Sequence, residues 1–148
     1  MVAVVTGGSR GIGKAIAEEL LKIDYSVIIT ARNKSGEAEA LEKEYDGKVF
    51  FVPCDISKDE DRKNLFSFVD GTFGKLDLLV NNAGVAPRER KDILEITPED
   101  FDCLTDINLK GTFFVTQGLA PLLMKNEKSR IVNISSMSFL LFLSVTVF

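Results

Sequence analysis

Five short apolar segments alternate along this chain with segments of helical spacing, and that alternation restricts the fold more than any other feature. The apolar segments are rich in β-branched residues and span positions 2–5, 26–30, 49–52, 76–80 and 130–134. Between them, apolar residues recur every three or four positions, which is the spacing of an amphipathic helix. Strands that alternate with helices predict an α/β fold with a parallel sheet covered on both faces, doubly wound because crossover connections are right-handed.

Two of the helical segments carry start signals. Ser57 and Glu60 have the spacing of a capping box ahead of the third helical segment. Thr97 is followed by Pro98 and two acidic residues, which predicts a helix that starts at Pro98 with Thr97 as its cap. Because the chain has no internal repeat and no low-complexity linker, residues 1–137 are expected to form one domain.

Any ligand site is expected at one edge of the predicted sheet. In open α/β sheets, ligands bind at the carboxyl ends of the strands, near the point where the strand order reverses. The predicted location of a site is therefore the set of loops that follow Val5, Thr30, Val52, Val80 and Ile134.

A glycine-rich segment, positions 6–13, joins the first predicted strand to the first predicted helix. Gly7 would allow a tight turn, Gly11 would let the backbone approach a pyrophosphate, and Gly13 would let helix and strand pack closely. The N-terminus of the helix would then present free N–H groups and a positive dipole end to the phosphates. Between a strand and a helix, such a segment predicts a dinucleotide-binding site.

Composition argues against several classes of function. A net charge of −4 argues against a nucleic-acid partner. The chain has no histidine, so histidine-based catalysis and the usual zinc ligands are excluded. Cys54 and Cys103 match no metal-ligand spacing, and no metal site is predicted. We expect both to be free thiols of a cytoplasmic protein.

No membrane association is expected. The N-terminal apolar run leads directly into glycines, without the basic start and the cleavage site of a signal peptide. The longest apolar run, positions 139–148, is interrupted by Ser144 and Thr146. It is shorter than the roughly 20 residues that a helix needs to span a bilayer.

The glycine-rich segment and four later segments, taken in order, resemble the short-chain dehydrogenase/reductase family. The later segments are positions 54–56, 81–84, 107–111 and 131–136. The resemblance implies a Rossmann-like fold and hydride transfer between a nicotinamide cofactor and a carbonyl or an alcohol.

Within that family, positions 82–88 and 107–114 look most like the 3-oxoacyl-[acyl-carrier-protein] reductase group. The resemblance implies a small-molecule carbonyl or acyl-carrier substrate for the full-length protein, and a homo-oligomer, either a dimer or a tetramer. Arg88, Arg90 and Lys91 would suit an acidic carrier protein, although a solvated loop is the simpler explanation.

The same resemblance assigns a set of residues to the cofactor. They are Thr6, Gly7, Ser9, Arg10, Gly11, Ile12, Gly13, Arg32, Asp55, Ile56, Asn82, Ala83 and Gly84. Asp55 would accept a hydrogen bond from the adenine amino group, and it also suits a helix cap. The asparagines at positions 81–82 would brace the sheet, while the small residues after them would lie against the cofactor.

Position 31 bears on the choice between the two nicotinamide cofactors. An acid at the end of the second strand accepts from the ribose 2′-hydroxyl and repels a 2′-phosphate. This chain has Ala31 where NAD-preferring relatives resemble one another in having aspartate, and Arg32 and Arg10 lie nearby in sequence. Two arginines can bind a 2′-phosphate through charge-assisted hydrogen bonds. They favour NADP(H) over NAD(H), the alternative being that both are solvated surface charges.

Two residues are catalytic by resemblance, Asn108 and Ser136. Asn108 lies inside an apolar helical pattern, where a polar residue needs a partner. It is either a satisfied core amide or a member of a catalytic tetrad that holds a water. Ser136 would hydrogen-bond the substrate carbonyl, with Ser135 as the competing choice.

The remaining tetrad members, a tyrosine and a lysine four residues later, are absent. Twelve residues follow Ser136, and none of them is tyrosine or lysine. Positions 138–148 form an apolar tail instead of the family's loop of small residues. We therefore expect a truncated, inactive form, and keep two alternatives: a non-catalytic NADP(H)-binding module and a non-functional fragment.

Truncation would leave the fifth predicted strand as a sheet edge. It would also uncover a helix expected over positions 111–125. The apolar residues of that helix are Phe113, Phe114, Val115, Leu119, Leu122 and Leu123. An exposed patch of this kind favours self-association.

Overall fold

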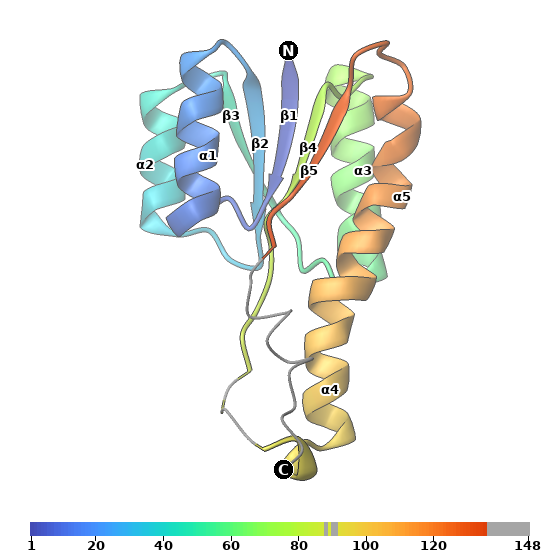
Figure 1. The fold of residues 1–148 in the computed structure, drawn as a ribbon. Coiled ribbons are helices and arrows are strands. Elements are labelled where there is room, and N and C mark those ends of the chain that lie inside the picture. The colour runs from blue at the N-terminus through green and yellow to red at the C-terminus, as the bar shows by residue number, and fades with distance from the viewer. Residues whose placement is uncertain (88, 90–91, 136–148) are drawn as a thin grey trace.

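A parallel five-stranded sheet with helices on both faces makes up the fold (Figure 1). The structure is a computed structural model, which describes residues 1–87, 89 and 92–135. The strands are β1 Val2–Thr6, β2 Ser26–Ala31, β3 Val49–Pro53, β4 Leu78–Asn81 and β5 Arg130–Asn133. Their order across the sheet is β3-β2-β1-β4-β5, so the predicted Rossmann-like, doubly wound α/β fold is confirmed.

Helices cover the sheet in two layers (Figure 1). The first layer consists of α1 Gly11–Lys22 and α2 Gly36–Glu44, and the second consists of α3 Asp59–Phe73 and α5 Thr112–Leu123. Between β4 and α5 lie a short 3₁₀ turn, η1 Ile93–Glu95, then α4 Pro98–Thr105 and a π-helical turn, η2 Asp106–Gly111. In Figure 1 the helix from α4 to α5 is continuous, and its α4 end extends past the carboxyl ends of the strands.

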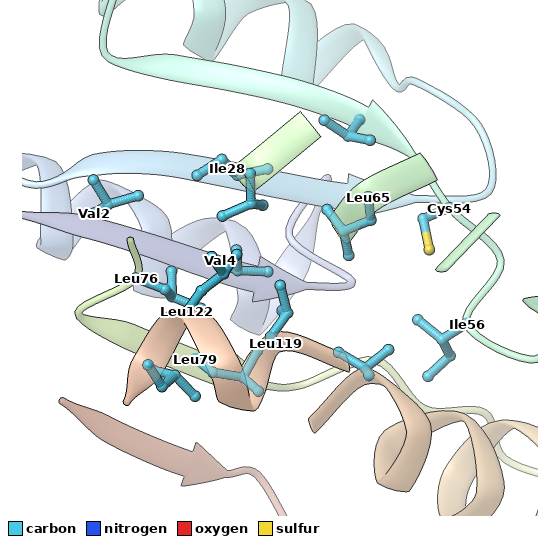
Figure 2. Close-up of a cluster of buried hydrophobic side chains, with 14 residues drawn as sticks. Val2, Val4, Ile28, Cys54, Ile56, Leu65, Leu76, Leu79, Leu119 and Leu122 are labelled. Carbon is cyan, nitrogen blue, oxygen red and sulfur yellow. The ribbon is translucent and has the colours of Figure 1, made fainter. Parts of the chain in front are cut away.

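Alternate side chains of the strands enter two separate cores. Val4 and Ile28 pack under α3 and α5, whereas Val5 and Ile29 pack under α1 and α2. Figure 2 shows the first core, which runs from Val2 at one end to Cys54 and Ile56 at the other. Because both faces of the sheet are buried, the strands have continuous apolar sequences instead of alternating ones.

The direction of the crossovers changes at β1. From β1 the chain passes outward to β2 and β3, and it then returns to place β4 and β5 on the other side of β1. The loops after β1 and β4 therefore diverge at the carboxyl edge, where such folds hold their ligands.

One predicted helix cap is confirmed and the other is wrong. Thr97 Oγ1 accepts from the Asp100 N–H (3.2 Å), and the Asp100 carboxylate accepts from the Thr97 N–H (3.4 Å). Ser57 does not cap α3, which begins at Asp59 after Lys58. Its hydroxyl donates to Asp55 Oδ1 instead (2.7 Å), a local hydrogen bond of the kind that competes with capping.

The fourth strand begins later than expected, and α5 is less exposed than expected. The N–H of Leu76 donates to Leu122 O (3.1 Å), so β4 starts at Leu78. Of the six apolar residues predicted to be uncovered, Val115, Leu119, Leu122 and Leu123 are buried in the core. Only Phe113 (59% exposed) and Phe114 (37%) are exposed, and the ring of Phe114 still contacts Arg62 on α3.

At the carboxyl side of the described chain, β5 is one edge of the sheet, and all of its residues are exposed. The expected division between residues 1–137 and the tail at 138–148 lies outside the described residues. None of the helices in the described part of the chain is long and apolar enough to cross a membrane.

Candidate functional site

The loops after β1, β2, β3 and β4 surround a cleft of about 680 Å³ at the carboxyl edge of the sheet. Its walls come from positions 7, 9–13, 31–35, 37, 54–56, 82–85 and 107. All the predicted cofactor residues line this cleft except Thr6, which is buried beneath it. Residues that the sequence placed far apart are thus brought to one surface.

The glycine-rich segment forms the floor of the cleft. Gly7 and Gly11 have left-handed backbones, with φ of 66° and 56°. A Cβ on Gly11 would meet nothing within 4 Å, so this backbone is open to the cleft. A Cβ on Gly13 would lie 2.3 Å from Gly7 O and 2.4 Å from Asn82 Nδ2, so the helix can start here only because this residue has no side chain.

The N-terminus of α1 opens onto this floor. Arg10 is its N-cap residue but makes no side-chain cap hydrogen bond, and the first turn contains no acidic residue. Ile12, in that turn, is exposed and lines the cleft. The positive end of the helix is thus not neutralised by its own first turn, which suits an anionic group.

The side chains of Thr6 and Asn82 join the end of β1 to the loop after β4, where the strand order reverses. Thr6 Oγ1 accepts from the N–H groups of Asn82 and Ala83 (both 3.0 Å) and donates to Val80 O (3.3 Å). Asn82 Nδ2 donates to Thr6 O (2.9 Å) and Gly7 O (3.1 Å). The end of β4 is therefore held against the glycine-rich turn by side chains from both strands.

A second polar contact holds the loop after β2. Ser35 Oγ donates to Ser9 O (2.6 Å) and accepts from the Ala38 N–H at the start of α2 (3.1 Å). Ser35 was not among the predicted site residues, although a serine directly before a helical segment is a typical N-cap signal. Its hydrogen bond to Ser9 ties the loop after β2, which also contains Arg32, to the glycine-rich segment.

Three basic residues line the cleft near the glycine-rich segment and the loop after β2, and they differ in whether they form ion pairs. Arg10 and Arg32 are both exposed, and within the described part of the chain neither forms an ion pair. Lys34 pairs with Glu42 and lies over the ring of Phe51. The two guanidinium groups are therefore available to an anion, whereas the lysine is engaged.

The wall after β3 contains Asp55 and its neighbours. Asp55 Oδ1 accepts from the N–H and the hydroxyl of Ser57 (3.1 and 2.7 Å), and the Asp55 N–H donates to Asp61 (2.8 Å). Burial raises the pKa of the Cys54 thiol to about 12, and the Asp61 and Asp55 carboxylates add to the shift. Cys54 is therefore an unreactive neutral thiol at the base of this wall.

Asn108 lies in the π-helical turn η2 and holds the loop after β4. Its Oδ1 accepts from the Val85 N–H (2.8 Å) and its Nδ2 donates to Val85 O (2.9 Å). The alternative that Asn108 is a buried core amide is wrong, because the residue is exposed. Its neighbour Ile107 lines the cleft, and π-helical turns often occur at functional sites.

The other predicted catalytic residue, Ser136, lies outside the described residues. Ser135 follows β5 and is exposed. The two tyrosines of the chain, Tyr25 and Tyr45, pack against the core under α1 and α2. Among the described residues, no group of histidine, cysteine, aspartate or glutamate could hold a metal ion.

Solved structures with the same architecture include two of a 3-oxoacyl-[acyl-carrier protein] reductase from Brucella melitensis, one of them in complex with NAD. They are 39% and 38% identical to this chain, with TM-scores of 0.83, and the match covers 93% and 94% of it. It covers 57% and 56% of the reductase chains.

An uncharacterized oxidoreductase of Staphylococcus aureus strain USA300 is 32% identical over 137 residues, which are 93% of this chain and 58% of that protein. The chain thus spans little more than half the length of the relatives it matches. The family model described as short chain dehydrogenase matches residues 1–142, which include the glycine-rich floor, both asparagine segments and β5. This match shows that the chain belongs to the short-chain dehydrogenase family, whose members bind a nicotinamide cofactor.

Proposed function

We propose that this chain forms the cofactor-binding part of an NADP(H)-dependent oxidoreductase of the short-chain dehydrogenase family. The observation that carries the proposal is the cleft at the carboxyl edge of the sheet. An uncapped helix N-terminus opens onto its floor, and the cleft is lined by two arginines that form no ion pair with the described residues. A nicotinamide dinucleotide fits these residues, since Gly11 leaves the floor open and the start of α1 suits a pyrophosphate.

Each wall of the cleft has a role in this proposal. The floor would bind the pyrophosphate through N–H groups of the first turn of α1. The Asp55 carboxylate would accept a hydrogen bond from the adenine amino group. Ala83 and Gly84 would lie against the remainder of the nucleotide, held in place by the Thr6–Asn82 contacts.

The preference for NADP(H) rests on charge around Arg10 and Arg32. Ala31 provides no carboxylate to accept from a ribose 2′-hydroxyl, and the two arginines are free to bind a 2′-phosphate. Glu37 also lines the cleft, but Lys14 lies 3.8 Å from it and offsets its charge. One Brucella reductase structure contains NAD. In this chain, the side chains at positions 10, 31 and 32 would decide between NAD(H) and NADP(H).

Calorimetric titration with NADPH and NADH tests this preference. We expect NADPH to bind more tightly, and Arg32→Ala to weaken NADPH binding by about ten-fold or more while leaving NADH binding unchanged. Ala31→Asp should shift the preference toward NADH, because the new carboxylate would repel a 2′-phosphate.

Lys34→Ala is the matched control for this titration, because Lys34 is on the same loop but already pairs with Glu42. Its NADPH affinity should stay close to that of the wild type. Equal affinities for NADPH and NADH, unaltered by Arg32→Ala, would contradict the preference. Absence of binding by either cofactor would contradict the site.

The reaction we propose for the full-length protein is carbonyl reduction, on a small molecule or an acyl-carrier substrate. The bound nicotinamide would supply the hydride. Asn108 would keep the loop at Val85 in position and Ser136 would donate a hydrogen bond to the carbonyl. These 148 residues contain no Tyr-x-x-x-Lys pair after Ser136, so we expect them to bind cofactor without turnover.

An assay of NADPH oxidation with an acetoacetyl thioester separates this expectation from its alternatives. Binding without oxidation would support a cofactor-binding part that lacks its acid. Oxidation would show that another group provides the proton. An insoluble chain that binds nothing would support a non-functional fragment.

We also propose self-association through the outer side of α4, η2 and α5. Phe101, Leu109 and Phe113 are all exposed there, and apolar residues gathered on one helix tend to be covered by a partner. Light scattering after gel filtration should give the mass of a dimer or a tetramer. Phe113→Asp should shift it toward the monomer.

A further inference from the structure

An arginine is buried in the core where a helix normally carries an apolar residue. Arg62 lies one turn before Leu65 on α3, and its side chain is only 6% exposed. Arginine is rarely buried unless its guanidinium group is paired and hydrogen-bonded. Its partners therefore indicate what the burial achieves.

Three groups surround the guanidinium of Arg62. Its Nη1 donates to Ile56 O (2.7 Å), and its Nη2 lies 3.2 Å from Asp59 Oδ1. The ring of Phe114, on α5, has its centroid 5.3 Å from Cζ, which is within the range of a cation–π contact. Ile56 and Asp59 belong to the β3–α3 connection and the start of α3, whereas Phe114 belongs to α5, which packs beside α3 in the same layer.

The carbonyl that Arg62 holds is also a contact point for η2. A Cβ on Gly111 would lie 2.9 Å from both Ile56 O and Ile56 Cγ1, so the wall and the π-helical turn touch directly. Ile56 itself lines the cleft. On the same turn, Asn108 holds Val85 on the facing wall. Arg62 therefore holds Ile56, on the wall after β3, and also contacts Phe114 at the start of α5, directly after η2.

We infer that Arg62 is a positioning residue, which holds the Asp55–Ile56 wall of the cleft against η2 and thereby sets the affinity for the adenosine end of the nucleotide. The inference rests on the proposed function. The ion pair with Asp59 adds little net stability, because the Asp59 side chain is 66% exposed. The hydrogen bond to Ile56 O, by contrast, fixes a backbone carbonyl next to the residue expected to face adenine.

The test uses Arg62→Met, which retains the volume but removes the donors. Adenosine 2′,5′-bisphosphate and AMP are the probes, because they report on the adenosine end alone. We expect both to bind about ten-fold more weakly at a temperature well below Tm, as for the loss of a charge-assisted hydrogen bond, together with a modest fall in Tm because the buried Ile56 O loses this donor. Arg62→Lys should regain part of the affinity, since it retains one donor for Ile56 O.

Lys63→Met is the matched control, because Lys63 also pairs with Asp59 (2.6 Å) but is exposed. It should leave both affinities unchanged. A purely structural role of Arg62 would lower Tm in Arg62→Met while the affinity at low temperature stays constant. That result would overturn the inference.

Hydrogen exchange of the ligand-free protein keeps this inference separate from the proposed function. The N–H groups of Ser57 and Lys58 donate to Asp55 and should exchange faster in Arg62→Met, whereas the amides of β1 should not. If the wild type binds neither probe, the proposed function fails. Faster exchange confined to Ser57 and Lys58 would then still support the wall contact, and unchanged exchange would overturn it.

Discussion

The centre of the sheet and its β5 edge differ sharply in how much of the protein supports them. Every residue of β1 is buried, between β2 and β4 and beneath helices on both faces. Every residue of β5 is exposed, and α4 buries none of its residues. The glycine-rich floor of the cleft therefore rests on a complete core, whereas the side near Asn108 and β5 depends on a few polar contacts.

This difference between the centre and the β5 edge also separates the proposed cofactor-binding residues from the proposed catalytic residues. The residues proposed to bind the pyrophosphate and adenosine lie on the well-packed side, and the residues proposed to act on the substrate lie on or after the exposed side. A site placed on rigid elements keeps its geometry without its ligand. We expect the cofactor half of the cleft to be preformed to a greater degree than the half that faces the substrate.

The largest expected effect is at the glycine floor. Gly13→Ala would place a methyl group against Gly7 O, a backbone atom that cannot move without opening the turn. We expect a loss of about 3 kcal/mol or more in the free energy of unfolding, measured by urea denaturation. Gly36→Ala is the control, since a Cβ there meets nothing within 4 Å. Similar stabilities for the two variants would show that the floor is less tightly packed than described.

A pair of isoleucines tests the interior of the sheet against its β5 edge directly. Ile28 on β2 is 0% exposed, whereas Ile131 on β5 is 45% exposed. Ile28→Ala should lower the free energy of unfolding by about 2–5 kcal/mol, and Ile131→Ala by less than about 1 kcal/mol. Urea denaturation measures both. Equal losses would mean that β5 is covered in solution, for example by another copy of the protein.

A pair of asparagines tests the polar contacts of the two sides. Asn82→Ala removes the donors to Thr6 O and Gly7 O in a half-buried place, and should cost about 1–3 kcal/mol. Asn108→Ala removes two hydrogen bonds to Val85 in an exposed place, so its effect on global unfolding should be smaller. Faster hydrogen exchange at Val85 alone is expected for Asn108→Ala. Global destabilisation by Asn108→Ala would contradict this comparison.

The smallest expected effect concerns the two free thiols. Cys103 on α4 is exposed and Cys54 is buried, with a pKa raised to about 12. Iodoacetamide at pH 8 should label Cys103 readily and Cys54 only after unfolding, as followed by mass spectrometry. Because the raised pKa keeps the folded thiol neutral, this contribution to stability is complete below about pH 9 and is lost as the pH rises toward 12. Rapid labelling of Cys54 in the folded protein would show that its wall opens.

Several parts of the fold and the site were predictable because they depend on neighbouring residues. The alternation of apolar runs with helical spacing predicted the strands to within about two residues, since these periods are local. Thr97 and Pro98 predicted the start of α4 for the same reason. The glycine spacing predicted which part of the backbone would line the cleft, because glycine adopts the positive φ values of Gly7 and Gly11 most readily.

Other features depended on contacts that the apolar pattern and the cap signals do not show. Ser57 has the spacing of a cap, but Asp55 competes for its hydroxyl. The apolar residues of α5 do not reveal which side of the helix meets α3 and β4, so the expected bare face was mostly wrong. Arg62 has the helical spacing of the buried residues Leu65 and Val69, but its charge favours an exposed position, so the sequence pattern does not show which of the two signals prevails.

By itself, then, the sequence determined the order of strands and helices, the location of the glycine floor and the edge of the sheet at which the cleft lies. These follow from short periods and from the rule that parallel strands end at one edge. Only the tertiary structure decided which polar groups hold that cleft in shape: Thr6 with Asn82, Ser35 with Ser9, and Arg62 with Ile56. Such contacts arise where different segments meet in space. A hydrogen bond between two segments leaves no periodic pattern in the sequence of either segment.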